Sequence, residues 1–128
     1  MVDTARDYAA EHGYKKMCLL GTLPTMDGSF FQSSFAKRGI EVVTPNAEEK
    51  NYIGTKIETE LEFGWVLPET QRAFKEIAER IIREEQVQAI VLGCTELPLI
   101  FGDVELTVPY IDVMQVHIHT LVDLILQG

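Results

Sequence analysis

The sequence predicts an α/β fold in which a parallel sheet is flanked by helices. Short apolar runs alternate along the chain with longer segments whose apolar residues recur at helical spacing. Three of these runs stop at Gly21, Pro45 or Gly93, as is typical of strands buried on both faces of a parallel sheet. The length of 128 residues suits one compact domain.

Each element has its own signal. Residues 2–12 carry alanines and a tyrosine at helical spacing, with Gly13 at the C-terminal cap. Residues 16–20 (KMCLL) form an apolar strand, and residues 22–26 a polar turn that contains Pro24. In residues 28–38 Phe31 and Phe35 share one helical face, and residues 40–44 form a second strand.

The second half continues the alternation. Residues 47–63 are expected to form one helix with Ile53, Ile57 and Leu61 in a stripe, and another helix begins at Pro68. Residues 88–92 (QAIVL) form a strand, and residues 96–101 a short helix or turn. A last strand at residues 107–111 precedes a helix at residues 113–126, for which Asp112 is the expected N-cap.

Charge and composition exclude several classes of function. The net charge of −9 disfavours nucleic-acid binding, because an acidic surface repels phosphate backbones. No apolar run approaches the length of about 20 residues that crosses a bilayer, and the N-terminus lacks the order of a secretion signal. We therefore expect no membrane or nucleic-acid partner and a cytoplasmic location.

Cysteine and histidine spacing predicts no metal site. The two cysteines, Cys18 and Cys94, are expected to be free thiols, and no Cys/His cluster has zinc spacing. His117 and His119 are two residues apart and cannot share one helical face. Cys18 lies in the middle of a strand and is expected in the core.

Two loops follow strands at the edge of the sheet where α/β proteins bind ligands. In residues 93–96 Cys94 precedes a helix, whose N-terminus would lower the pKa of the thiol, whereas the carboxylate of Glu96 would raise it. Thr95 adds a hydroxyl. In the loop at residues 21–25, Thr22 and Thr25 could hold a carboxylate. The alternatives are a small buried cysteine at a strand end and ordinary turn chemistry.

Five segments, taken in order, resemble the aspartate/glutamate racemase superfamily. They are GTLPT at 21–25, GIEVVTP at 39–45, IETELEFG at 57–64, VLGCTELPL at 91–99 and VPYID at 108–112. Aspartate racemases are the most similar members. The resemblance implies two α/β lobes, each with one acid–base cysteine, and no cofactor. Cys94 matches the second-lobe cysteine, and Thr95 and Glu96 match the residues beside it, which assist carboxylate binding and tune the thiol. Thr22 and Thr25 match the loop that holds the substrate carboxylate. The resemblance thus implies Cys94 and Glu96 as catalytic residues and Thr22, Thr25 and Thr95 as substrate-binding residues.

The chain departs from this family in length, since members are about twice as long. The resemblance assigns residues 1–105 to the second lobe and residues 106–128 to a strand and helix that return to the first lobe. The first lobe and its cysteine have no counterpart here, so we expect the isolated chain to be inactive. We also expect exposed apolar residues at Val108, Ile111, Val116 and Leu121, and hence a homo-oligomer or a partner lobe.

A second departure concerns the substrate. Trp65 stands where many aspartate racemases carry a basic residue, so the amino acid could be aspartate or a related acid. Two other functions stay open. One is a related proton-transfer enzyme of the superfamily, such as a decarboxylase or an isomerase. The other is a non-catalytic carboxylate-binding remnant.

Overall fold

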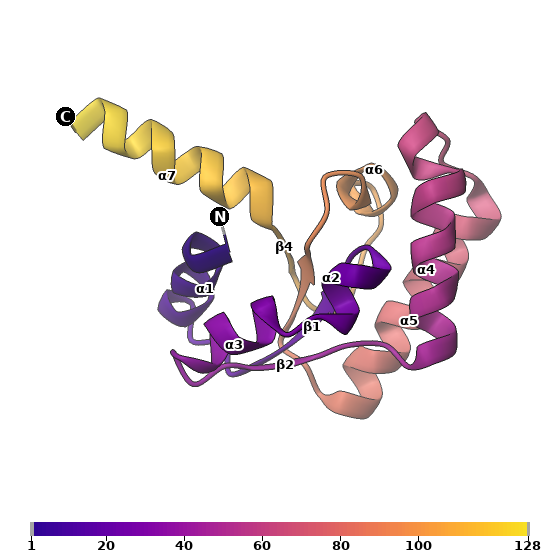
Figure 1. The fold of residues 1–128 in the computed structure, drawn as a ribbon, viewed down its shortest axis with the longest axis horizontal. Helices are drawn as coiled ribbons and strands as arrows, with labels where there is room; N and C mark the ends of the chain where they lie inside the picture. The colour runs from indigo at the N-terminus through magenta and orange to yellow at the C-terminus, as the bar shows by residue number, and fades with distance from the viewer. Residues whose placement is uncertain (1, 128) are drawn as a thin grey trace.

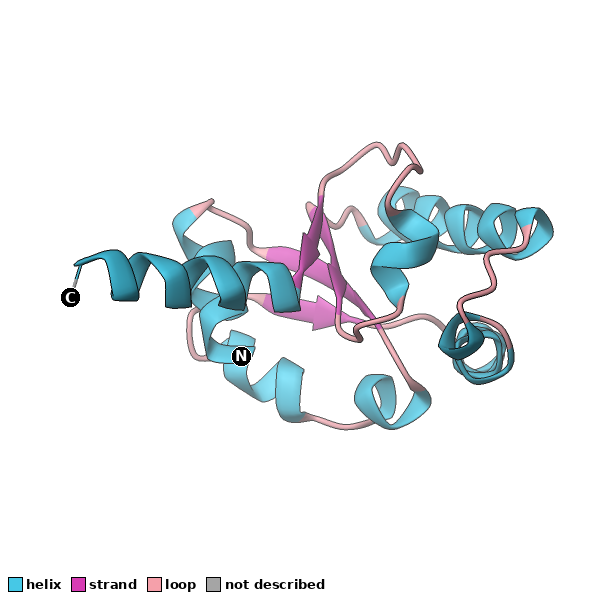
Figure 2. Cartoon of the chain, turned by 90° about the horizontal axis from the view of Figure 1, so that it is seen from above, coloured by secondary structure: helices cyan, strands magenta, loops and turns pink. Residues whose placement is uncertain are grey.

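A four-stranded parallel sheet forms the centre of the molecule, in the order β2-β1-β3-β4. The computed structural model describes residues 2–127. The strands are β1 (Lys16–Leu20), β2 (Glu41–Val43), β3 (Ala89–Leu92) and β4 (Tyr110–Asp112). Leu20 pairs with Leu92, and Leu92 with Asp112, so the carboxyl ends of three neighbouring strands are level. Helices lie on both faces of this sheet (Figure 2), as the alternating pattern predicted.

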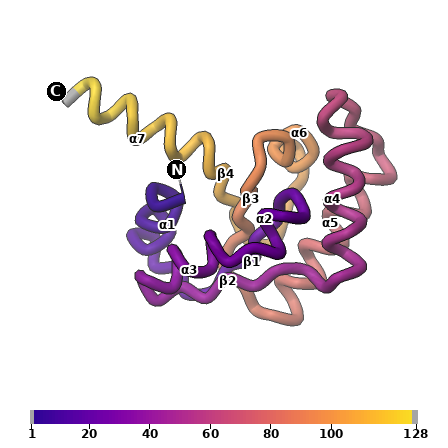
Figure 3. The backbone as a smooth tube through the Cα atoms, in the orientation of Figure 1, coloured from indigo at the N-terminus to yellow at the C-terminus, as the bar shows by residue number. Residues whose placement is uncertain are grey.

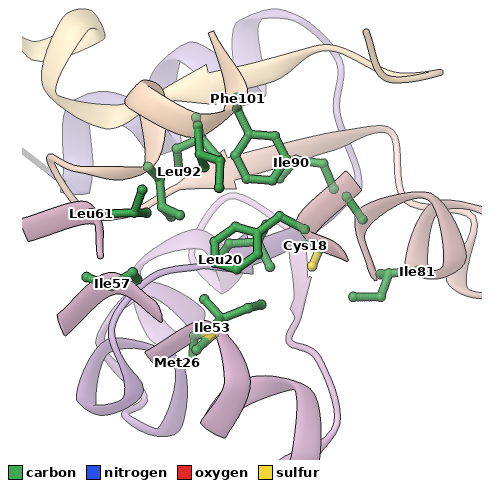
Figure 4. Close-up of a cluster of buried hydrophobic side chains, with 14 of the residues drawn as sticks. Cys18, Leu20, Met26, Ile53, Ile57, Leu61, Ile81, Ile90, Leu92 and Phe101 are labelled. Atoms are coloured by element: carbon green, nitrogen blue, oxygen red, sulfur yellow. The ribbon is translucent and has the colours of Figure 1, made fainter. Parts of the chain in front are cut away.

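Alternate residues of the central strands point to opposite faces of the sheet, where each meets its own helical layer. Met17 and Leu19 lie in a cluster with α1 (Val2–Glu11) and α3 (Phe30–Ala36). Cys18 and Leu20 lie in the larger cluster on the other face (Figure 4). That face is covered by four helices and one 3-10 turn. These are α2 (Leu23–Asp27), α4 (Ala47–Thr59), η1 (Leu61–Phe63), α5 (Pro68–Glu85) and α6 (Leu97–Phe101).

The predicted turn at residues 22–26 and the predicted helix at residues 47–63 differ in the structure. Residues 22–26 were predicted as a turn, but Leu23–Asp27 form the helix α2, because Pro24 stands in the first turn, where a missing N–H costs nothing. The single helix predicted at residues 47–63 ends at Thr59. Glu60 leaves helical geometry there, with φ −128° and ψ −61°, before the 3-10 turn.

The break at Glu60 is held by side-chain hydrogen bonds. The Glu60 carboxylate accepts from the hydroxyl of Thr70 at 2.6 Å and from the amino group of Lys56 at 2.7 Å. Thr70 is 1% exposed and Glu60 is 7% exposed. These bonds hold the pKa of Glu60 below its usual value, mainly through Lys56. The loop that follows is thereby anchored to the start of α5.

The C-terminal segment joins this sheet and then leaves the body. The predicted strand at 107–111 is shorter, Tyr110–Asp112, and pairs with β3. The helix α7 (Val113–Gln127) starts as predicted at Asp112, whose carboxylate accepts from the N–H groups of Met114 and Gln115. It lies beside α1, although the two are at opposite ends of the chain (Figure 3). The boundary at residue 105 stays a prediction.

The apolar surface of this segment differs from expectation. Ile111 is buried and Val108 and Val116 are partly buried, because β4 pairs with β3 and the first turn of α7 packs on the core. Leu121 is exposed, as predicted, at 46%. Within residues 2–127 every helix is too short or too polar to cross a lipid bilayer.

Candidate active site

The two loops that the sequence singled out leave adjacent strands at the same edge of the sheet. Leu20 and Leu92 are partners in the ladder, and the N–H of Gly93 donates to the carbonyl of Leu20 at 2.8 Å. The loop at residues 21–25 and the loop at residues 93–96 therefore start side by side. Parallel sheets bind ligands at this edge, beyond the carboxyl ends of their strands.

Gly93 permits this close approach because it has no side chain. A Cβ at this position would lie 2.9 Å from Cδ1 of Leu19, 3.2 Å from the carbonyl oxygen of Leu20 and 3.5 Å from the ring of Phe31. The first two separations are shorter than ordinary contacts, so a larger residue would push the loops apart. A Cβ at Gly21 would likewise lie 3.1 Å from Cγ2 of Thr25.

Thr22 and Thr25 face each other across the first turn of α2. Their hydroxyl oxygens are 2.9 Å apart, at hydrogen-bond distance, and both side chains are half-buried. Thr22 occupies the N-cap position of α2, yet its hydroxyl caps no backbone N–H. The carbonyl of Thr22 accepts from Met26 N–H at 3.0 Å instead. The two hydroxyls therefore bond to each other rather than to the backbone of the helix.

Cys94 lines a small cavity of about 130 Å³ on the α1/α3 face of the sheet edge. The other walls include Val2 of α1, Phe31 of α3, and Val113 and Met114 at the start of α7. The cysteine is half-buried. A neighbouring pocket contains Thr25 and shares the ring of Phe31. Phe31 therefore lines both the Cys94 cavity and the pocket that contains Thr25.

Burial raises the pKa of Cys94 to about 11. Hydrogen bonds from the backbone N–H groups of Glu96 and Leu97 lower it, as predicted for a site before a helix, but they do not compensate for the desolvation. The Glu96 carboxylate raises the pKa further, by repulsion and by stabilising the protonated thiol. The expected competition is thus decided by burial, and Cys94 is a neutral thiol near pH 7.

Thr95 and Glu96 complete this loop. Thr95 is exposed, and Glu96 is half-buried at the N-cap position of α6, where its side chain forms no capping hydrogen bond. Thr95 also borders the Cys94 cavity. The Thr95 hydroxyl is therefore accessible at the cavity, and the Glu96 carboxylate interacts with the Cys94 thiol.

A family model described as Asp/Glu/Hydantoin racemase matches residues 1–121. The chain belongs to the Asp/Glu/hydantoin racemase family. The match covers nearly the whole chain, including both loops. The family resemblance drawn from the five sequence segments is confirmed.

Solved structures agree with this family assignment. An aspartate racemase homologue from Pyrococcus horikoshii OT3 is 32% identical, with a TM-score of 0.89 over 96% of this chain and 54% of that chain. A provisionally assigned Asp/Glu racemase from Yersinia pestis is 29% identical, with a TM-score of 0.83 over 91% of this chain and 50% of that chain. The present chain thus spans about half the length of these racemase-family structures.

The second cysteine of this racemase-family chain lies outside the site. Cys18 is 0% exposed on the α4/α5 side of the sheet, and burial raises its pKa to about 12. The sequence prediction that Cys18 belongs to the core is confirmed. Among residues 2–127 no three His, Cys, Asp or Glu side chains come together at metal-binding distance.

Sequence reasoning missed the apolar walls of the racemase-family site. Phe31 was recognised only as one member of a helical stripe with Phe35, and Val113 and Met114 only as the start of the last helix. No local signal distinguishes them, because their position in the cavity depends on α3 and α7 reaching the end of β3. Their placement next to Cys94 is a property of the tertiary structure.

Proposed function

We propose that this chain supplies one half of the active site of a cofactor-independent amino-acid racemase. The substrate would be aspartate or a related acidic amino acid, and Cys94 would exchange a proton with its Cα. The observation that supports this most is the juxtaposition of a half-buried thiol with a hydroxyl-rich loop at the carboxyl edge of the sheet. The family membership indicates the same reaction class.

Inversion at Cα needs one group that removes a proton and another, on the opposite face, that delivers one. With a pKa of about 11, the Cys94 thiol holds its proton and is ready to deliver it. In that step the S–H bond breaks, a C–H bond forms at the carbanionic Cα, and the sulfur keeps the electron pair. The N–H groups of Glu96 and Leu97 would stabilise the resulting thiolate.

The substrate carboxylate would be held by hydroxyl groups. Thr22 and Thr25 present two oxygens 2.9 Å apart, and the exposed Thr95 adds a third hydroxyl beside the thiol. Donors directed at this carboxylate would stabilise the negative charge that develops when the α-proton leaves. Glu96 would keep the proton on Cys94 until the carbanion forms, because its charge disfavours the thiolate.

The opposite face of the substrate would need a group from elsewhere. Cys18 is 0% exposed in the core and is not among the residues that line the cavity. The matched relatives are about twice as long as this chain. We therefore propose that the isolated chain has little or no racemase activity, and that a first lobe must supply the second acid–base cysteine.

Solvent deuterium exchange at Cα tests this proposal. Aspartate and glutamate would be incubated in D₂O with the chain, with and without the half of the Pyrococcus horikoshii homologue that the chain does not cover. Exchange should be minimal with the chain alone and should rise when the half is added. Replacement of Cys94 by Ala should abolish the rise, whereas Cys18→Ala should leave it unchanged.

Two outcomes would contradict the proposal. Racemisation of either aspartate enantiomer by the purified chain alone would show that a second group is already present. Equal exchange with wild type and Cys94→Ala in the complemented mixture would remove Cys94 from the reaction. Binding of aspartate without exchange in any mixture would point to a carboxylate-binding protein instead.

One observation favours a related decarboxylase as a second candidate. A decarboxylase needs a proton donor on only one face, and the protonated state of Cys94 suits that role. In this reaction the bond between Cα and a carboxylate breaks, CO₂ leaves, and the thiol proton goes to Cα. Release of CO₂ from a 2-substituted malonate, with no exchange of aspartate, would favour this function.

A further inference from the structure

Phe31 lies where the two cavities of the candidate site meet. Among the described residues it alone lines both the Cys94 cavity of about 130 Å³ and the pocket of about 260 Å³ that contains Thr25. Each cavity is smaller than the roughly 300 Å³ at which ligand pockets usually begin, and the two together exceed that size. A ligand that contacts both the thiol and the threonine loop would therefore also contact Phe31.

The ring of Phe31 reaches the loop that carries the thiol. Its Cζ atom lies 3.5 Å from the position of a Cβ at Gly93, the residue before Cys94. Phe35 follows on the same helical face, with its ring centroid 6.1 Å from that of Phe31, but it is 0% exposed and lines neither cavity. Phe31 is therefore the member of this aromatic pair that borders the site.

The helix that carries Phe31 is held in place from the opposite side. In Figure 1 α3 lies against α1. Ser34, one turn after Phe31, donates a hydrogen bond to the Asp3 carboxylate at 2.7 Å and accepts one from the Arg6 guanidinium at 3.4 Å. Because these bonds hold the helix, the side chain at position 31 decides how much space connects the two cavities.

We propose that Phe31 divides one binding site into a thiol subsite and a carboxylate subsite, and that its ring limits the contact between them. The inference rests on the proposed function, in which the threonine loop holds a carboxylate and Cys94 exchanges a proton with Cα. A carboxylic acid in the Thr25 pocket presents the carbon next to its carboxylate to Cys94 only as far as the ring allows. Phe31 is thus a positioning residue for the substrate.

Alkylation of Cys94 by two reagents tests this role. The reactive carbon of iodoacetate carries a carboxylate, as Cα of an amino acid does, whereas iodoacetamide has a similar size and no charge. Both react with the same thiolate and release iodide, so the ratio of their rates does not depend on the pKa of the thiol. Mass spectrometry of the peptide that contains Cys94 measures each rate separately from any reaction at Cys18.

Phe31→Leu should raise the ratio of the iodoacetate rate to the iodoacetamide rate about threefold or more, because the carboxylate-held carbon then lies closer to the thiol. Phe31→Met, with a flexible side chain of similar volume, should also raise it and is the variant to use if Phe31→Leu does not fold. Phe35→Leu is the matched control and should leave the ratio unchanged. The double variant Phe31→Leu/Thr25→Val should return the ratio to the wild-type value. Circular dichroism identifies the folded variants.

Three outcomes would overturn the inference. They are an unchanged ratio in a folded Phe31 variant, an equal rise in Phe35→Leu, and a rise that survives the Thr25→Val substitution. The alkylation experiment needs neither a first lobe nor turnover, so its failure is distinct from a failure of the proposed function. Deuterium exchange at Cα that depends on Cys94 would support the racemase reaction even where the alkylation ratio is unchanged.

Discussion

The N–H of Gly93 donates a 2.8 Å hydrogen bond to the carbonyl of Leu20, the last residue of β1. This bond extends the β1–β3 ladder by one step beyond the strands and aligns the two loops that form the candidate site. The threonine pair and Cys94 therefore occupy neighbouring positions at one edge of the sheet. The arrangement depends on close backbone contact, which the first prediction addresses.

Substitution of Gly93 by Ala should destabilise the fold by about 1–3 kcal/mol, the usual cost of forcing extra atoms into a packed site. The new Cβ would meet Leu19 at 2.9 Å and the Leu20 carbonyl at 3.2 Å. Urea unfolding measures the loss. Gly54→Ala is the control, because its Cβ would lie at ordinary contact distance from Leu23 within helix α4. Equal stability of the two variants would contradict the prediction.

The alkylation rate of Cys94 should rise about tenfold per pH unit from neutral pH up to about pH 11, since only the thiolate reacts and burial raises its pKa to about 11. Glu96→Gln should increase the rate at a given pH, because it removes a charge that disfavours the thiolate. Stopped-flow alkylation with mass spectrometry of the labelled site checks both. An alkylation rate that levels off near pH 8.5 would show that burial does not raise the pKa of Cys94.

Thr70→Val should lower the free energy of unfolding by about 1–3 kcal/mol at neutral pH, because it leaves the buried Glu60 carboxylate without one donor. The pKa of Glu60 is lowered in the fold, so its stabilising contribution is present above the unfolded pKa and is lost as the pH falls through the folded value. The difference in free energy of unfolding between wild type and the variant should therefore become smaller in acid. Thr59→Val, at an exposed position, should show neither effect.

Thr25→Val should weaken aspartate binding about tenfold, the equivalent of about 1.4 kcal/mol, if the hydroxyl pair holds the substrate carboxylate. The substitution keeps the side-chain shape and removes the 2.9 Å contact with Thr22. Titration of aspartate followed by NMR shifts of the two loops measures the change. The exposed Thr55→Val is the control. Unchanged binding in Thr25→Val would assign the threonines to loop structure alone.

Asp112→Ala should increase hydrogen exchange in the first turn of α7 and cost about 0.5–2 kcal/mol, because the carboxylate caps the N–H groups of Met114 and Gln115. Exchange measured amide by amide localises the effect. Asp123→Ala removes the same charge from a position within the helix and should leave the first turn protected. If both variants open α7 equally, the cap does not set its stability.

Much of the fold follows from the sequence alone. The strand at Lys16–Leu20 was predicted with its exact bounds, since a short apolar run that stops at a glycine is typical of a strand buried on both faces of a parallel sheet. The positions of Cys94, Thr22 and Thr25 after strands were predictable for the same reason. So was the burial of Cys18. These features can be predicted from local sequence because they depend on the spacing of apolar residues and on the residues that flank each run.

Two features of the candidate site depend on the tertiary structure and cannot be predicted from local sequence patterns. Leu20 and Leu92 are 72 positions apart, and only their pairing in the sheet makes the two loops neighbours. Burial raises the pKa of the Cys94 thiol more than the backbone N–H groups of Glu96 and Leu97 lower it, although the sequence displays only the helix N-terminus. The desolvation of a thiol depends on all the groups that surround it, and many of these are distant in sequence. It is therefore fixed only when the chain is folded.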